Sequence, residues 1–287
     1  MKTVTAVILT FNNVDMLASL LRRIASQTRP PDGTIVIDNA SADKTGAIIR
    51  NEFPGVRHVQ LPENTGSGGY QEGLKIASET GDLVWTLDDD VMPEKNALEK
   101  LVRGMARLEK SRQVAAVRSV GSRHPEDEPT ELEIVPWRGT LIKCGAIKEV
   151  GLPRKDFFLY GDDLEYSLRL RQHGYSFFWI PSSKCAEGRS SKKQDTIVGK
   201  RVSLYRAPFR LYYAFRNEIS IYLTYRLYLR FVRTFAYAIK VSFYILVTER
   251  LRGLPKLRAL TAGLRDGLRG KLGRNLNYLP HADGIES

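Results

Sequence analysis

The chain has 287 residues, of which 43% are hydrophobic, so it is long enough and apolar enough to bury a full core. Its two cysteines, Cys144 and Cys185, exclude a disulfide framework and a zinc-type cysteine cluster, and two reduced thiols fit a cytosolic protein. The formal charge of +12 is concentrated in residues 188–275, which carry 20 Lys and Arg against 4 Asp and Glu, so a near-neutral body precedes a strongly basic tail.

The N-terminus is predicted to be a strand rather than a targeting segment. In MKTVTAVILTFNN, one lysine precedes a short apolar run that alternates with threonines. A signal peptide would need a longer apolar stretch and a small-residue cleavage site. We therefore expect the first strand of the fold at residues 3–10.

Strands and helices alternate along the first third of the sequence. The predicted order is strand 3–10, helix 14–26, a strand within 30–41, helix 43–53, strand 56–60, helix 68–79 and strand 82–87. This alternation favours an α/β fold with a parallel sheet and right-handed crossovers. Farther along, the pattern predicts a helix at 93–110, strands at 115–120 and 132–143, a helix at 162–173 and a last strand at 176–181.

Polar side chains follow the strands at the points where they end. Thr10 follows the first strand, Asp38 the second, Asn64 the third, and Asp88 to Asp90 the fourth. Because ligands bind at the carboxyl ends of strands in open α/β sheets, these groups are expected to form one site.

The stretch ENTGSGGYQEG, residues 63–73, is rich in glycine. Gly66, Gly68 and Gly69 allow close backbone approach, and the helix that follows offers free N–H groups to an anion. The spacing is not that of a dinucleotide fingerprint, and the lysine of a phosphate-binding loop is missing. A tight strand-to-helix turn is the alternative.

Three consecutive carboxylates follow the strand at 82–87. Side chains at positions i and i+2 of an extended segment point the same way, so Asp88 and Asp90 can share a divalent cation while Asp89 faces elsewhere. Hard oxygen ligands suit Mg2+ or Mn2+, which would hold a diphosphate. A solvated acidic turn is the alternative.

A second acidic group lies in FFLYGDDLEYSLRLRQHGY, residues 157–175. Asp162, Asp163 and Glu165 fall where a helix is predicted to begin, and N-terminal capping explains one of them without any function. A carboxylate surrounded by aromatic rings and other acids would have a raised pKa, as a general base near neutral pH requires.

Six stretches occur in an order that resembles one known family. They are VILTFNN, VIDNAS, ENTGSGGYQEG, WTLDDDVMP, WRGTLI and FFLYGDDLEYSLRLRQHGY, spread over about residues 3–190. Together they resemble the GT-A fold, family 2 glycosyltransferases, inverting enzymes that use nucleotide sugars. The resemblance implies a Rossmann-like, mostly parallel sheet flanked by helices. The glycine-rich loop, DDD and GDDLEYSLR are most similar to bacterial galactofuranosyltransferases and rhamnosyltransferases that build surface polysaccharide, such as O-antigen.

The resemblance also implies roles for the matching residues. Asp163 would be the general base, and Asp88 and Asp90 would hold Mn2+ or Mg2+ with the diphosphate. The donor would be bound by Thr10, Asp38, Asn64, Gly66, Gly68, Gly69 and Asp89. The acceptor would be bordered by Trp137, Arg138 and Asp162, with apolar packing as the alternative role for Trp137.

One departure from the family concerns the metal. Many relatives carry a histidine after the last strand of the body, whereas this sequence reads IPSSKCAEGRSS there. Glu187, Cys185 or water is left as the substitute.

The reaction implied is a single displacement that inverts the anomeric carbon. Galactofuranose from a uridine donor is favoured, and rhamnose from dTDP-rhamnose is the alternative. The resemblance further implies a lipid-linked glycan as acceptor. Two readings from other classes are a nucleotidyltransferase, for which the first strand lacks the expected glycine and lysine, and an inactive sugar-nucleotide-binding scaffold.

The basic tail is predicted to be a separate helical extension, with a catalytic domain at 1–199 and the tail at 200–287. Its aromatic residues and arginines interleave at helical spacing, which is typical of a helix that lies on an anionic membrane. Its most apolar part, 234–248, is shorter than a membrane span and contains Lys240. The expected location is the inner face of the cell membrane. The alternatives are packing on the body or on a second copy of the chain, and no nucleic-acid-binding module is visible.

Overall fold

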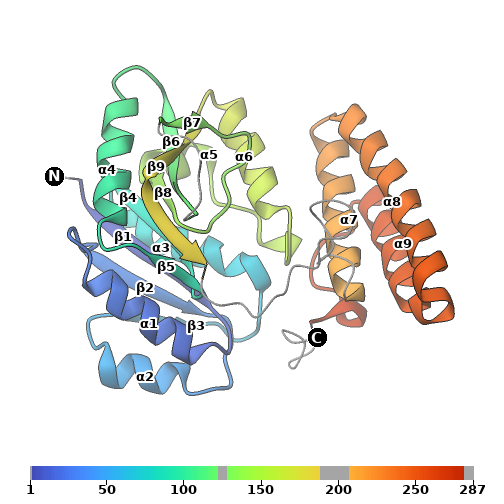
Figure 1. Ribbon diagram of the computed structural model, residues 1–287, viewed down its shortest axis with the longest axis horizontal. Coiled ribbons are helices and arrows are strands. Elements are labelled where there is room, and N and C mark those ends of the chain that lie inside the picture. Colours follow the sequence, from blue (N-terminus) through green and yellow to red (C-terminus); the bar gives the residue numbers. More distant parts are fainter. Residues whose placement is uncertain (1, 122–127, 188–206, 281–287) are drawn as a thin grey trace. The chain divides into compact units, whose positions relative to one another are not determined.

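The computed structural model describes residues 2–121, 128–187 and 207–280 (Figure 1). These residues form two compact units. The first contains residues up to 154 together with 163–187, and the second contains 155–162 together with 207–280. The predicted domain boundary between residues 199 and 200 lies outside the described residues.

The first unit begins with the predicted alternation of strands and helices. Its strands are β1 (Val4–Thr10), β2 (Gly33–Asp38), β3 (Arg57–Gln60), β4 (Leu83–Asp88), β5 (Val91–Pro93), β6 (Val114–Val120), β7 (Thr130–Glu131), β8 (Thr140–Lys143) and β9 (Ser176–Glu187). Its helices are α1 (Val14–Ala25), the short η1 (Gly66–Gly68), α3 (Gly69–Thr80), α2 (Thr45–Glu52), α4 (Ala97–Leu108), α5 (Cys144–Val150) and α6 (Asp162–Gln172).

The strands form one mixed sheet with the order β3-β2-β1-β4-β8-β6-β9-β5, and β7 pairs with β9. The four strands predicted first, β1 to β4, are parallel neighbours. Thr10 pairs with Asp38 and Leu9 with Asp88, so the carboxyl ends of three strands lie side by side. The predicted α/β architecture is therefore confirmed.

Helices cover both faces of this sheet because successive strand residues point to opposite sides. Ala6 and Ile8 of β1 belong to the core that includes α1 and α4, whereas Val7 belongs to the core that includes α3, α5 and α6. On that second face, α3 packs tightly on the sheet. A Cβ added at Gly73 would lie 2.3 Å from Val7 Cγ1, and one added at Gly69 would lie 2.4 Å from Leu9 Cδ1.

The middle of the chain differs from the prediction in four places. Val91–Pro93 form the short strand β5, so the helix predicted from residue 93 begins only at Ala97 as α4, and the helix α5 was not predicted. The segment 132–143 forms a strand only in β8, whereas β9 continues to Glu187, well beyond the predicted end. The last residues of β9, Cys185 to Glu187, are extended because they pair antiparallel with β5. Local sequence does not reveal this contact.

The second unit confirms the predicted helical extension. Its elements are η2 (Lys155–Phe157), α7 (Pro208–Thr224), α8 (Tyr228–Glu249), η4 (Arg250–Gly253), α9 (Leu254–Leu268) and η5 (Leu276–Tyr278). Glycines bring α9 against α7, since a Cβ at Gly263 would lie 2.5 Å from the carbonyl oxygen of Tyr212.

Helix α8 buries only one narrow stripe. Its buried side chains are Thr234, Ala238, Val241 and Ile245. The stretch Tyr228–Leu268, to which it belongs, has the length and composition of a membrane-crossing helix. Helix α8, with 22 residues, is longer than the predicted apolar part at 234–248.

Candidate active site

The aspartates at the end of β4 have different partners. Asp89 accepts hydrogen bonds from Thr10 Oγ1 at 2.7 Å and from Asn13 Nδ2 at 2.8 Å. Burial raises the pKa of Asp89 to about 6, and these two hydrogen bonds oppose the rise. Asp89 therefore ties the loop after β1 to the end of β4, and its contact with a donor stays a prediction.

The side chains of Asp88 and Asp90 both face the guanidinium group of Arg138. Arg138 Nε lies 3.3 Å from Asp88 Oδ2, and Arg138 Nη2 lies 3.7 Å from Asp90 Oδ1. The Tyr70 hydroxyl donates to Asp88 Oδ1 at 2.5 Å. The structure thus brings these two carboxylates together, and it places Arg138, which we expected beside the acceptor, against them.

This carboxylate pair fits a divalent metal ion bound together with a diphosphate. Mg2+ and Mn2+ prefer oxygen ligands, and at phosphate sites they commonly take one or two carboxylates from the protein. Among the described residues, no group of three or more His, Cys, Asp and Glu could hold a metal by itself. The other ligands would then be diphosphate oxygens and water.

Cys185, one of the candidates for the missing metal ligand, lies in the apolar core. Its thiol is buried in the core beside β5, and burial raises its pKa to about 11. A bound metal ion would itself remove the proton of a coordinating thiol, so a ligand role for Cys185 stays a prediction. The side chain of the other candidate, Glu187, lies outside the described part of the chain.

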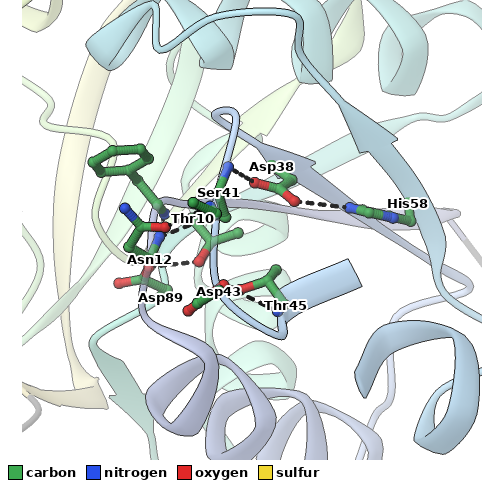
Figure 2. A network of polar contacts seen from close by, with 10 residues as sticks. Thr10, Asn12, Asp38, Ser41, Asp43, Thr45, His58 and Asp89 are labelled. Atoms are coloured by element: carbon green, nitrogen blue, oxygen red, sulfur yellow. Dashed lines mark hydrogen bonds and ion pairs between the residues drawn. The ribbon is translucent and has the colours of Figure 1, made fainter. Parts of the chain in front are cut away.

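The loops after β1 and β2 are joined by a polar network (Figure 2). Asn12 N donates to Ser41 Oγ at 3.0 Å, and Asp38 accepts from Ser41 N at 2.8 Å and lies 3.2 Å from His58 Nε2. Both loops contain a non-glycine residue with a left-handed backbone, Asn12 with φ 48° and Ala40 with φ 64°. Such conformations are uncommon and concentrate where the surrounding structure holds a functional loop in place.

Asp38 and Thr10, the predicted nucleoside contacts, are both buried at these strand ends. Each has a partner within the protein, so their contact with a nucleoside remains a prediction. A carboxylate oxygen can accept more than one hydrogen bond, which leaves Asp38 able to take a ligand donor as well.

The glycine-rich loop is held by asparagines. Asn39 Oδ1 accepts from Thr65 N, Asn39 Nδ2 donates to the Gly66 carbonyl at 2.8 Å, and Asn64 Oδ1 accepts from Gly66 N at 2.8 Å. Gly66 has φ 60°, a conformation that glycine adopts without strain. Gly68 is buried beside it at the start of α3. The close packing of Gly69 on Leu9 accounts for this glycine without a ligand.

Asp163 lies in the first turn of α6 and accepts a hydrogen bond from Leu164 N at 2.8 Å. Burial raises its pKa, opposed by that hydrogen bond and by Arg118, and supported by the nearby charge of Asp88. These electrostatic partners place Asp163 on the side of the sheet where β4 ends. The third acidic candidate, Glu165, is buried in an ion pair with Arg169 at 2.8 Å and has a structural role.

Trp137 and Asp162, two of the predicted acceptor residues, are both buried. Trp137 is buried, and its ring packs 5.3 Å from that of Tyr70 and 5.5 Å from that of Tyr166. The packing alternative is thus the role that the structure describes for Trp137, because two tyrosines cover its ring. Asp162 is also buried, and it is the last residue of the segment that belongs to the second unit.

Three residues of the site, Asn13, His58 and Tyr70, were not predicted from the sequence. Tyr70 directly follows the glycine-rich loop, which is the only sequence signal that could have marked it. The pairing of His58 with Asp38 depends on β3 lying beside β2 and could not be read from the sequence.

Known proteins resemble this chain in sequence. Residues 5–162 match the family described as Glycosyl transferase family 2. The galactofuranosyltransferase GlfT1 of Mycolicibacterium smegmatis is 22% identical over 204 residues, which are 61% of this chain and 68% of that protein.

Two solved structures are similar in fold. The mannosyltransferase PcManGT from Pyrobaculum calidifontis, in complex with GDP-Man and Mn2+, aligns with a TM-score of 0.58 at 19% identity, covering 94% of this chain and 88% of that one. S. aureus TarS 1-349 in complex with UDP aligns with a TM-score of 0.56 at 16% identity, covering 93% and 92%. These likenesses confirm the GT-A architecture that the motifs predicted.

Proposed function

Because the chain belongs to glycosyl transferase family 2, it is a glycosyltransferase, and we propose that it transfers galactofuranose from UDP-galactofuranose to a lipid-linked glycan at the cytoplasmic face of the membrane. The observation that carries the proposal is that the carboxylates of Asp88 and Asp90 converge on the guanidinium of Arg138 at the end of β4. The charge of Asp88 also acts on Asp163. Transfer from a nucleotide sugar needs both a carboxylate pair that can hold a metal ion with the diphosphate and a carboxylate that can accept the proton of the acceptor hydroxyl.

In the proposed reaction, Asp163 accepts the proton of the acceptor hydroxyl. The hydroxyl oxygen forms a bond to the anomeric carbon while the bond from that carbon to the diphosphate breaks, so the configuration inverts. The raised pKa of Asp163 suits a base that works near neutral pH. A divalent metal ion held by Asp88 and Asp90 would offset the charge that develops on the departing UDP.

The protein itself pre-organises the donor site. The network among Asn12, Asp38 and Ser41 fixes the two loops that would border the nucleoside, and Asn39 and Asn64 fix the glycine-rich loop. A rigid site avoids the entropic cost of ordering loops when the donor binds. The name of the GlfT1 relative supports galactofuranose as the sugar, and the TarS complex supports a uridine nucleotide.

Helix α8 supports the membrane part of the proposal. Residues spaced three or four apart leave one apolar stripe exposed, which consists of Tyr228, Val232, Phe235, Ile239 and Phe243. Arg230, Arg233 and Lys240 lie along the same helix, and residues 207–280 carry 14 Lys and Arg against 3 Asp and Glu. Apolar residues beside cations fit a surface of anionic lipid.

The same cations favour a helix that lies on the membrane over one that crosses it. Arg230, Arg233 and Lys240 would enter the hydrocarbon if α8 spanned a bilayer, and a charged side chain at that depth is costly. At the interface, their long side chains reach the headgroups while the apolar stripe is buried.

The test measures transfer and binding with matched donors. Purified protein is incubated with Mn2+, a polyprenyl-linked oligosaccharide and either UDP-galactofuranose or dTDP-rhamnose, and the product is identified by mass spectrometry. We expect transfer of galactofuranose. Transfer of rhamnose alone would replace the proposed donor, and a product with retained anomeric configuration would contradict single displacement.

Asp90→Ala is expected to remove the metal-dependent part of donor binding. Mn2+ should raise the melting temperature of the wild-type protein in the presence of UDP, because a ligand that binds only the folded state stabilises it. In Asp90→Ala this increase should largely disappear, with UDP binding weakened at least tenfold. The control is Glu79→Ala, an exposed carboxylate of α3. Equal shifts in both variants would contradict the proposed metal site.

A further inference from the structure

The segment just before Asp163 belongs to the helical unit. Residues Lys155–Asp162 group with α7, α8 and α9, although they connect two parts of the first unit in sequence. Asp156 O accepts a hydrogen bond from Gly273 N at 2.6 Å, and the Tyr160 hydroxyl accepts one from Arg210 at 2.8 Å. The chain thus enters α6 directly from a segment that the C-terminal helices hold.

The backbone of this segment is unusual. Phe158 has φ 64°, Tyr160 has φ 63° and Gly161 has φ 84°. Left-handed conformations are uncommon for bulky residues and persist only where the surroundings enforce them. Strained backbone of this kind concentrates at functional sites, so the groups that enforce it are of interest.

Asn217 of α7 holds the strained residues by their carbonyl groups. Its Nδ2 lies 3.1 Å from Phe157 O, 2.7 Å from Leu159 O and 2.7 Å from Tyr160 O. The Asn217 side chain is fully buried. One amide group therefore contacts three carbonyl oxygens of the segment, of which Phe157 O also accepts a backbone hydrogen bond from Leu159 N at 2.8 Å.

Arg216 orients that amide. Its Nε donates to Asn217 Oδ1 at 2.8 Å, which fixes the amide with Nδ2 toward the carbonyls, and its Nη2 donates to Phe157 O at 2.8 Å. The guanidinium is fully buried and lies 4.7 Å from the ring centroid of Tyr213. A buried cation is costly unless hydrogen bonds compensate it, and here they are made to Asn217, to Gly273 O and to Phe157 O in the segment before Asp163.

We propose that Asn217, oriented by Arg216, is a positioning residue that sets the backbone leading into Asp163. The inference rests on the proposed role of Asp163 as the base. It gives the helical extension a role in the transfer step itself, in addition to binding the membrane. Loss of the anchor would let Phe158 and Tyr160 relax to ordinary backbone conformations, and the first turn of α6 would lose its fixed start.

Asn217→Asp is the sharpest variant, because aspartate has the same shape. It keeps an oxygen that accepts from Arg216 Nε and replaces the donating NH2 by an oxygen that repels the three carbonyls. The control is Thr234→Val, which removes a hydrogen bond to Glu218 at 3.0 Å in the same unit without contact to residues 155–162. Gly161→Ala perturbs the same segment from its own backbone, because Gly161 has a positive φ and a Cβ there would lie 3.1 Å from Ile221 Cδ1.

Four quantities are measured on the full chain, namely kcat, donor Kd, amide hydrogen exchange and melting temperature, with whichever sugar nucleotide the wild-type enzyme turns over. We expect kcat to fall at least tenfold in Asn217→Asp and Gly161→Ala, donor Kd to stay within twofold, and amide hydrogen exchange to rise at 157–163. Thr234→Val should keep kcat despite a similar loss of melting temperature. Unchanged kcat with increased exchange, or a kcat that tracks melting temperature in all variants, would overturn the inference. Failure of UDP-galactofuranose as donor would instead refute only the proposed donor.

Discussion

Asp89 and Asp163 are both carboxylates whose pKa is raised by burial, yet their surroundings suit different roles. Asp89 accepts from two side chains of the first loop, Thr10 and Asn13, so it is bound into the fold. Asp163 accepts from the backbone N–H of Leu164 at a helix start. A base must exchange its proton with a substrate. Asp163 accepts from a neighbouring backbone N–H rather than from two side chains of another loop, so it is better suited to that task than Asp89.

Asp163→Asn is expected to lower kcat by about 10²–10⁴-fold while donor Kd changes less than twofold, because the amide cannot accept the proton. In the wild type the base is active only when deprotonated. Since burial raises the pKa of Asp163, the rate should fall on the acid side at a higher pH than an ordinary aspartate would give. Steady-state kinetics across pH measure both effects, and near-wild-type turnover by Asp163→Asn would refute the base assignment.

Tyr70→Phe tests a residue that the sequence did not mark. The variant removes the hydrogen bond from the Tyr70 hydroxyl to Asp88 Oδ1 and keeps the ring that packs on Trp137. A hydrogen bond to a charged group contributes about 2 kcal/mol, so we expect the Mn2+-dependent binding of UDP to weaken by up to about thirtyfold. Calorimetric titration measures it. The hydrogen bond would be irrelevant to metal binding if the affinities were equal.

At the scale of single elements, α3 shows that glycines can serve packing as well as ligands. The helix lies so close to β1 that Gly73 has no space for a methyl group, and Gly69 has none either. The sequence motif that resembles a donor-binding loop is therefore also the motif that seats a helix on the sheet. Only Gly66, with its positive φ, needs glycine for the turn itself.

Gly73→Ala should destabilise the protein by about 1–3 kcal/mol, because overpacking forces side chains and backbone to move. Gly145→Ala is the matched control. Its Cβ meets nothing within 4 Å, and alanine favours the helix α5 over glycine by up to about 1 kcal/mol. Urea denaturation measures both changes. Equal stability of Gly73→Ala and wild type would show that α3 can shift away from the sheet.

At the scale of the whole molecule, the chain combines a near-neutral catalytic unit with a basic helical unit. The exposed large hydrophobic residues of the described chain lie on α8 and in the residues that follow it. A contiguous apolar surface of this kind usually marks a partner or a membrane. The distribution of charge and apolar surface thus agrees with an enzyme whose acceptor is held by lipid.

Replacing Ile239 and Phe243 by aspartate should lower binding to vesicles that contain anionic lipid by at least tenfold, because the exposed apolar stripe would lose two of its side chains. The two side chains are 64% and 69% exposed, so the fold should tolerate the change. Leu276→Asp, at an equally exposed apolar residue outside α8, is the control. Vesicle sedimentation measures the binding. Loss of a dimer in solution without loss of vesicle binding would assign the stripe to a second copy of the chain.

Short stretches of sequence were enough to predict the alternation of strands and helices, the parallel strands β1 to β4 and the carboxylates at their ends. These features are local, since hydrophobic periodicity and strand-end residues are written in short stretches. Each motif is also a short stretch, and the order of the motifs led to the correct family. The basic tail and its helical spacing were visible in the same way.

The contacts between residues distant in sequence became visible only in the folded chain, and the fold established which of them meet. It placed Arg138 between Asp88 and Asp90, extended β9 by pairing it with β5, and brought Asn217 to the backbone before Asp163 across 57 to 60 residues of sequence. The physical reason is that such contacts depend on how the whole chain packs, and a local pattern contains no information about its partner.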